Sequence, residues 1–201
     1  MTNHRRDGAG AFADLQAELQ SIRTRPEILV KTGPSPAKLA PHAISLNATV
    51  EIAGQPVADG RLVILHDPAG QDSWHGTWRI ILMASADVDT STAEDPVLID
   101  MGWTWLEEAL GEHELAVGSF GGTVTRTASH SYGILEDRPA TADLQIRASW
   151  TPAVDQPHPG VPRERTALVI REHVAAWLDL MALITALQPY QEGLSHLEGR
   201  R

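Results

Sequence analysis

The sequence predicts an α+β fold in which an antiparallel sheet of about five strands carries helices packed on one face. The first observation is the stretch from Ile44 to Ile52, where apolar even-numbered residues alternate strictly with polar odd-numbered ones. Such a strand has one dry and one wet face, which indicates an antiparallel sheet. The second observation is an apolar stripe of helical period near each end of the chain, starting at Phe12 and at Ile170. Read in order, the patterns give α-β-β-β-α-β-β-α.

The first half of the chain predicts one helix and three strands. Apolar residues from Phe12 to Ile22 recur three and four residues apart, which places them on one face of a helix that ends before Pro26. A loop rich in Pro follows at 33–37 and cannot continue a helix or a strand ladder. Alternating patterns then predict strands at 44–52, 61–66 and 78–88.

The second half predicts two helices around two further strands. Asp95 can cap a helix, and Pro96 is tolerated at its first position, so a helix is expected to run from here to Gly111. Two alternating stretches follow, and after a Pro-rich link the last helix carries the apolar stripe from Ile170 to Ile184. The predicted strands are 123–131 and 142–150.

Length and composition place limits on the class of protein. A chain of 201 residues is expected to form one domain, here 9–187, between a flexible N-terminus at 1–8 and a flexible C-terminal tail at 188–201. The absence of cysteine excludes disulfides, thiolate zinc sites and cysteine nucleophiles. The sequence shows no signal peptide and no apolar run long enough to span a bilayer, so we expect a cytoplasmic protein without membrane association.

The charge of the chain argues against nucleic acid as a partner. Lys and Arg total 16 against 26 Asp and Glu, for a net charge of −10. No Lys or Arg lies between Arg79 and Arg126, although this interval holds many carboxylates. Such a surface repels phosphate backbones. It is either a solvated acidic face or a docking surface for a basic partner.

Two resemblances accompany these predictions. The order of elements resembles the fold of type III secretion chaperones and the related YbjN-like proteins, which is a likeness of architecture without a shared motif. Several phrases in sequence are similar to the actinobacterial family called domain of unknown function 3000, over roughly 12–187. These phrases are Arg61–Gln71, Gly102–Leu106, Gly121–Arg126, Arg138–Ala142 and Ile146–Pro152. The resemblance implies no particular activity, cofactor or catalytic residue.

The segment between Arg61 and Arg79 gathers the most chemically capable side chains in the chain. Two histidines with a nearby carboxylate could bind a metal ion, but their spacing matches no known ligand pattern. The alternative is turn chemistry, in which an Asp bonds its own backbone and a Gly takes a positive φ. We predict no metal, no cofactor and no catalytic residue, and we take these side chains as candidates for contact with a ligand or partner: His66, Asp67, Trp74, His75 and Arg79.

Three further candidates lie outside that segment. Trp103 falls beside the main stripe of its helix, and like Trp74 it could grip a flat ligand or a partner if exposed. Arg126 and His130 alternate with the polar row of their strand, so both are expected to point inward. An inward Arg must be paired, either as a buried anchor or at the floor of a cavity.

Two hypotheses for function follow from the residues. The first is a non-catalytic protein-binding or adaptor domain, dimeric or with another protein as partner, that uses either an exposed sheet face, indicated by Ile81 and Met83, or the acidic helix. The second is a small-molecule-binding domain or small enzyme with a pocket around His66, Asp67, Trp74, His75 and Arg126. A third, a nucleic-acid accessory, conflicts with the net charge and would depend on the basic N-terminal arm, 1–38.

Overall fold

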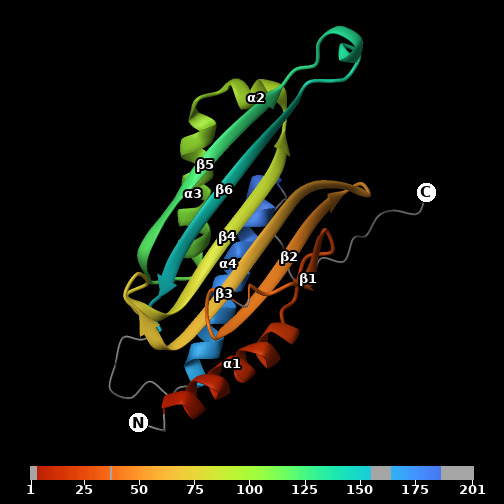
Figure 1. The fold of residues 1–201 in the computed structure, drawn as a ribbon. Coiled ribbons are helices and arrows are strands. Elements are labelled where there is room, and N and C mark those ends of the chain that lie inside the picture. Colours follow the sequence, from red (N-terminus) through yellow and green to blue (C-terminus); the bar gives the residue numbers. More distant parts are fainter. Residues whose placement is uncertain (1–3, 37, 155–163, 187–201) are drawn as a thin grey trace, which may run out of the picture.

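The structure, a computed structural model, describes residues 4–36, 38–154 and 164–186. Within them, four α-helices, a short 3₁₀ helix and six strands form one layer of sheet and one layer of helices (Figure 1). The helices are α1 (His4–Gln20), α2 (Thr90–Glu94), α3 (Val97–Glu112) and α4 (Glu164–Ile184), and the 3₁₀ helix is η1 (Gly133–Leu135). The strands are β1 (Ile28–Gly33), β2 (His42–Ile52), β3 (Gln55–Gln71), β4 (Gly76–Val88), β5 (Val117–Ser129) and β6 (Thr141–Pro152).

All neighbouring strands pair antiparallel, in the order β1-β2-β3-β4-β6-β5. The first four strands follow one another as a meander. The chain then crosses over through α2 and α3 to the outer strand β5 and returns as β6 between β4 and β5 (Figure 1). The predicted α+β class, with an antiparallel sheet and helices on one face, is confirmed.

The predicted number of strands is wrong, because the sheet has six strands and not five. The missed strand is β1, an edge strand of 6 residues in which only Ile28 is buried. Because β1 pairs on one side only and most of it faces solvent, its sequence lacks the alternation that marks the other strands. With β1 and the short α2 included, the order of elements no longer matches the one that resembled secretion chaperones, so that resemblance has no support.

The core lies between the sheet and the helices, and it uses the predicted alternation. Even-numbered residues of β2, β4 and β6 point to the helices, including Trp78 at 2% and Trp150 at 1% exposure. Trp177 of α4 fills the centre of the layer at 1% exposure. The helix side of Gly60 on β3 has no room for a side chain, since an added Cβ would lie 2.6 Å from Met181 Sδ.

The helix starts follow local chemistry in part. Asp95 Oδ1 accepts a hydrogen bond of 2.9 Å from the backbone N–H of Val97 and so caps α3, as predicted. Helix α1 begins at His4, so residues 4–8, expected to be flexible, are helical. The tail at 188–201 and most of the Pro-rich link lie outside the described residues. No described helix combines the length and the apolar character needed to cross a membrane.

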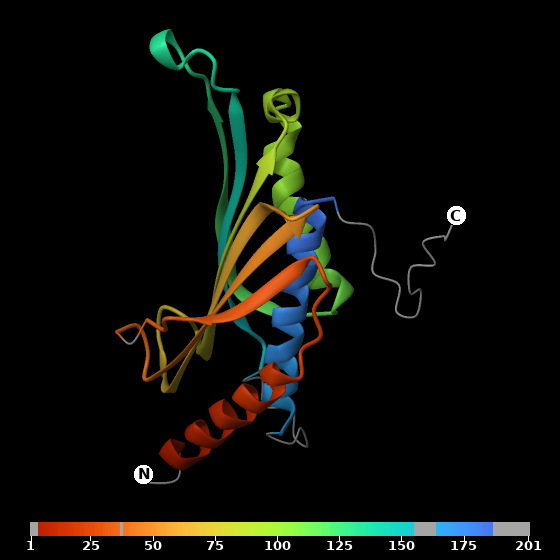
Figure 2. The ribbon, with the colours of Figure 1, turned by 90° about the vertical axis from the view of Figure 1, so that its right-hand side faces the viewer.

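The face of the sheet opposite the helices, here called the uncovered face, is partly overlaid at one end. Val63, Leu65 and Trp74 form a second buried cluster there, with Ala40 and Ile81 packed against it. Figure 2 shows the loop before β2 and the β3–β4 hairpin projecting on this side, away from α3 and α4. The rest of the uncovered face is open, and a groove begins where this cluster ends.

Candidate functional site

His66 is a core residue on the helix side of β3. It is 5% exposed, and its ring stacks on Trp78 at a centroid distance of 4.1 Å and on His42 at 5.8 Å. Its Nδ1 lies 3.1 Å from the carbonyl oxygen of Thr77. This packing makes His66 part of an aromatic column at one end of the sheet.

Asp67 shapes the hairpin. One carboxylate oxygen accepts the backbone N–H of Ala69 at 3.0 Å, and the other accepts the side-chain amide of Gln71 at 3.2 Å. Gly70 takes the positive φ of 74° that closes the turn. The turn chemistry offered by the sequence as an alternative is therefore present in the structure.

The remaining hairpin residues tie the β3–β4 connection to the end of β5 and β6. Trp74 is buried on the uncovered side, and its carbonyl accepts the hydroxyl of Thr151. His75 is exposed with φ 55°, and its Nδ1 lies 2.9 Å from Ser119 Oγ. The guanidinium of Arg79 donates to Ser149 Oγ and to the carbonyl oxygen of Ser119, and burial lowers its pKa.

The candidates outside the hairpin are spread over the other end of the sheet and over α3. Trp103 is half-buried, stacks on Phe120 at 4.8 Å, and donates its Nε1–H to Glu107 at 2.8 Å. Arg126 is half-buried on the helix side and donates to the carbonyl oxygen of Asp95 at 2.8 Å. His130, expected to point inward, lies beyond the end of β5 and is exposed, because the sheet stops before it.

These side chains do not converge on one cavity. His66 and Trp74 lie on opposite faces of the sheet. Arg126 pairs with Leu144 at the far end, eight residues along β4 from the row that holds His66, which is roughly 26 Å. The five residues of the predicted pocket therefore have separate structural settings.

The uncovered face instead carries a groove with a volume of about 680 Å³. Its floor is apolar, with one wall from the loop before β2 and the other from β5. Gly121 and Gly122 give the β5 wall no side chain here, and at Gly122 an added Cβ would collide with the backbone of Arg147 and Ala148. The groove is lined chiefly by Pro36, Leu39, Arg61, Val63, Ile81, Met83, Gly121, Thr123 and Arg147.

A row of three residues crosses the groove. Arg61, Met83 and Arg147 pair side by side on β3, β4 and β6, so that a methionine stands between two arginines on the same face. The Cα atoms of the two arginines are about 10 Å apart, two strand spacings. Met83 is 38% exposed, an unusual position for an apolar side chain at the centre of a sheet.

The two arginines differ in their partners. Arg61 donates to Ser45 Oγ at 3.0 Å and to the carbonyl oxygen of Pro34 at 2.8 Å, which fixes it against the groove wall. Arg147 is exposed and makes no hydrogen bond or ion pair with any residue that the structure describes. Its five N–H donors are available to an acceptor in the groove.

The opposite end of the uncovered face is acidic. Asp87 lies directly across from Asp143, and Asp59 is on the neighbouring strand. Burial raises the pKa of Asp87, and the nearby carboxylates of Asp143 and Asp59 raise it further. The uncovered face is therefore basic at the groove and acidic beyond it.

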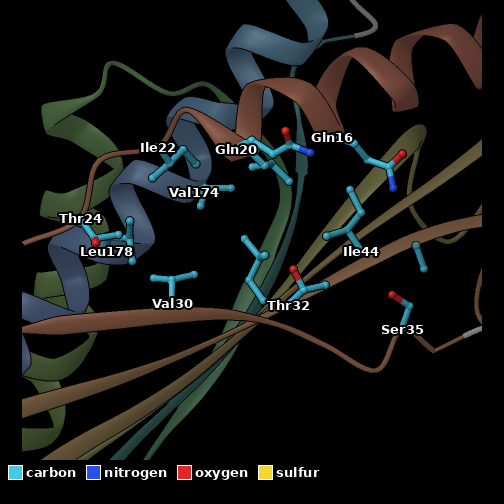
Figure 3. Close-up of a pocket in the computed structure, with 13 residues that line it drawn as sticks. Gln16, Gln20, Ile22, Thr24, Val30, Thr32, Ser35, Ile44, Val174 and Leu178 are labelled. Atoms are coloured by element: carbon cyan, nitrogen blue, oxygen red, sulfur yellow. The ribbon is translucent and has the colours of Figure 1, made fainter.

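A second cavity of about 420 Å³ lies between α1, α4, β1 and β2. Figure 3 shows Gln16 and Gln20 extending from α1 over it, with Val174 and Leu178 of α4 at the back. No charged side chain lines it. Its rim is formed by amides and hydroxyls that make no hydrogen bond with other described residues, namely Gln16, Gln20, Thr24, Thr32 and Ser35.

Sequence reasoning pointed to Ile81 and Met83 but missed Arg61 and Arg147. Only the strand register brings these two arginines to either side of Met83. In the described part of the chain, no group of three or more His, Asp or Glu side chains is placed to hold a metal ion.

Comparison with known proteins gives one match. Residues 9–193 match the family described as protein of unknown function DUF3000. No curated protein and no solved structure matches the chain. Because the family model covers most of the sequence, the resemblance seen in the sequence is confirmed, and the chain belongs to the DUF3000 family.

Proposed function

We propose that this chain is a protein-binding module, and that the groove around Arg61, Met83 and Arg147 holds an apolar, acidic segment of its partner. The observation that carries the proposal is the row of three residues across the groove floor. It combines an exposed apolar centre with guanidinium groups on both sides. Such a combination of apolar anchor and Arg is typical of binding hot spots.

The charge of the groove indicates that the partner segment carries negative charge. The chain as a whole carries −10, so an acidic partner is repelled from most of its surface. The groove is an exception, because Arg147 has no partner among the described residues and Arg61 stands beside it. A carboxylate placed here gains a charge-assisted, bidentate hydrogen bond, which fixes its position in the groove.

A direct test uses short labelled peptides as probes. Ten-residue peptides with two Leu followed by two Asp are compared with matched peptides in which Lys replaces Asp, by fluorescence anisotropy at 0.05 and 0.3 M salt. We expect the acidic peptides to bind more tightly, and the added salt to weaken them, because screening acts on the exposed Arg147. Arg147→Glu and Met83→Asp are each expected to lower the affinity at least tenfold.

The matched control is Glu108→Arg on α3, which reverses another exposed charge on the helix side of the molecule. It is expected to leave the affinity unchanged. Equal binding of acidic and basic peptides, or full binding by Arg147→Glu, would overturn the proposal.

A second candidate function, binding of a small molecule, is favoured by the cavity between α1, α4, β1 and β2. Its apolar floor and uncharged polar rim fit a neutral amphipathic molecule. Nile red, a neutral dye, is a suitable probe. Thr32→Trp, which fills the rim, is expected to abolish the gain in dye fluorescence, whereas its neighbour Lys31→Trp on the uncovered face should preserve it. A signal unaffected by Thr32→Trp would place the dye elsewhere.

A further inference from the structure

The β5–β6 connection, residues 130–140, here called the tip, exposes an apolar surface. Ile134 is 101% exposed, Tyr132 81% and Leu135 42%. All three lie in or beside η1, whose turn is held by backbone hydrogen bonds from Leu135 to Tyr132 and from Glu136 to Gly133. The turn is thus ordered by its own backbone while its apolar side chains contact solvent. Exposed apolar groups clustered on an ordered projection mark an interaction site.

The chemistry of the tip complements that of the groove. Glu136 and Asp137 follow directly after Leu135 and are exposed, and Arg138 is the only Lys or Arg in the tip. The tip is therefore apolar and acidic, where the groove is apolar and basic. This is the kind of segment that the proposed function assigns to the partner.

The tip is poorly placed to fill the groove of its own chain. The carboxylates of Asp87 and Asp143 lie on the uncovered face between the two, in the last rows of β4 and β6 before the tip. They repel Glu136 and Asp137 from a path back along the sheet. The strands that carry the tip also hold it in place, because β5 and β6 are paired up to Ser129 and Thr141. This pairing would have to open before the tip could fold back onto the sheet.

A second copy can satisfy both sites at once. Figure 2 shows the tip at one end of the molecule, leaning to the same side as the uncovered face, while the loop before β2, whose Pro36 and Leu39 line the groove, lies toward the other end. Two complementary sites that lie apart along one face are joined twice by a two-fold axis in the plane of that face. Such an arrangement is closed, and neither site is left open.

From these observations we infer that the partner segment is the tip of a second copy of this chain, so that two chains insert their tips into each other's grooves. The inference rests on the proposed function of the groove. It places Ile134 against the exposed Met83 and the acidic pair Glu136 and Asp137 beside Arg147. The two-fold axis then passes near Asp87 and Asp143, which lie between groove and tip, and the projecting tips have to hold these carboxylates of the two copies apart.

The test is the oligomeric state of the full chain, measured by sedimentation velocity from 1 to 200 μM. The wild type is expected to form a dimer that does not grow further. Ile134→Ser is expected to give a monomer, and because Ile134 is fully exposed within its own chain, the far-UV circular dichroism should be unchanged. Glu108→Arg, on the opposite side, should remain dimeric.

A charge exchange separates a specific contact from general repulsion. Arg147→Glu alone puts a carboxylate in both grooves where the acidic tip must bind, and Glu136→Arg with Asp137→Arg makes both tips basic, so each protein alone is expected to be monomeric. An equal mixture of the two is expected to restore the dimer, since each altered groove then meets a basic tip and each unaltered groove an acidic tip. A monomeric wild type, a dimer that survives Ile134→Ser, or a mixture that stays monomeric would overturn the inference. Growth beyond a dimer would overturn the two-fold arrangement.

The groove itself is checked separately with the labelled acidic peptides. If they bind in an Arg147-dependent way while the wild-type chain stays monomeric, the proposed function stands and the second copy is the wrong partner. If neither the peptides nor a second copy binds, both fail.

Discussion

The buried histidine of α4 makes the stability of this protein sensitive to acid. His173 has 0% exposure, and its Nδ1 accepts the indole N–H of Trp150 at 3.2 Å. The ring is therefore neutral, with its proton on Nε2. Burial, helped by the nearby His113 and opposed by Glu172, lowers the pKa of His173 to about 4.

The size of the effect follows from linkage. An unfolded His titrates near 6.5, so the folded state resists a proton that the unfolded state accepts between about pH 6.5 and pH 4. Because the pKa of this histidine is lower in the folded state, it does not reduce the stability of the protein at any pH above the pKa of the unfolded state. As the pH falls through this window, the free energy of unfolding decreases by about 3 kcal/mol from this one residue. That is a large share of the roughly 5–15 kcal/mol of a typical domain.

The assay is urea unfolding followed by tryptophan fluorescence at pH 7, 6, 5 and 4. His173→Gln keeps an oxygen that can accept the N–H of Trp150 but cannot titrate. We expect this variant to be less stable than the wild type at pH 7 by about 1–2 kcal/mol. Its further loss on going to pH 4 should be smaller than that of the wild type by about 3 kcal/mol.

Other groups also titrate, so the comparison between proteins is what counts. Arg171 and His113 hold the pKa of Glu172 below its ordinary value, and this contribution is lost in acid in both proteins alike. His75→Gln, at an exposed position, is the matched control and should follow the wild type. If His173→Gln lost as much stability as the wild type between pH 7 and pH 4, the assignment of the acid sensitivity to His173 would be refuted.

Three further substitutions test the packing around the sheet. Gly60→Ala puts a methyl group against Met181 and should cost about 1–3 kcal/mol, read from urea midpoints; an unchanged midpoint would contradict the tight contact. Thr151→Val removes the hydroxyl that binds the carbonyl of Trp74 and should cost about 1 kcal/mol; faster amide exchange confined to the β3–β4 hairpin should accompany it, and uniform exchange would count against this role. His113→Ala removes the contacts of 3.2 and 2.9 Å from α3 to two carboxylates of α4 and should lower the melting temperature, more at low than at high salt; a salt-independent loss would contradict an ionic link.

The long strands and helices could be predicted because each buries one side, which gives its apolar residues a regular spacing. The apolar residues of the alternation from Ile44 to Ile52 and of the stripe on α4 do face the core. Strand β1 was missed because an edge strand exposed to solvent needs no such period. The cap at Asp95 and the turn at Asp67 could also be predicted, since each depends on residues two positions away.

The candidate site could be predicted from the sequence only in part. The many reactive side chains of the hairpin indicated a site there, but Asp67 stabilises the turn and His66 packs in the core. The groove depends on Arg61, Met83 and Arg147, which are far apart in the chain. They meet only because β6 pairs with β4, and this pairing depends on the return of the chain after its crossover to β5.

By itself the sequence determined the fold class, the faces of the main strands and helices, the membership of the DUF3000 family and the acidic balance of the chain. Only the tertiary structure decided which residues share a surface, from the row of arginines around Met83 to the exposed apolar tip. The physical reason is the range of the interactions involved. Periodicity and caps are set by residues a few positions apart, whereas a surface is set by strand register and packing between segments distant in sequence.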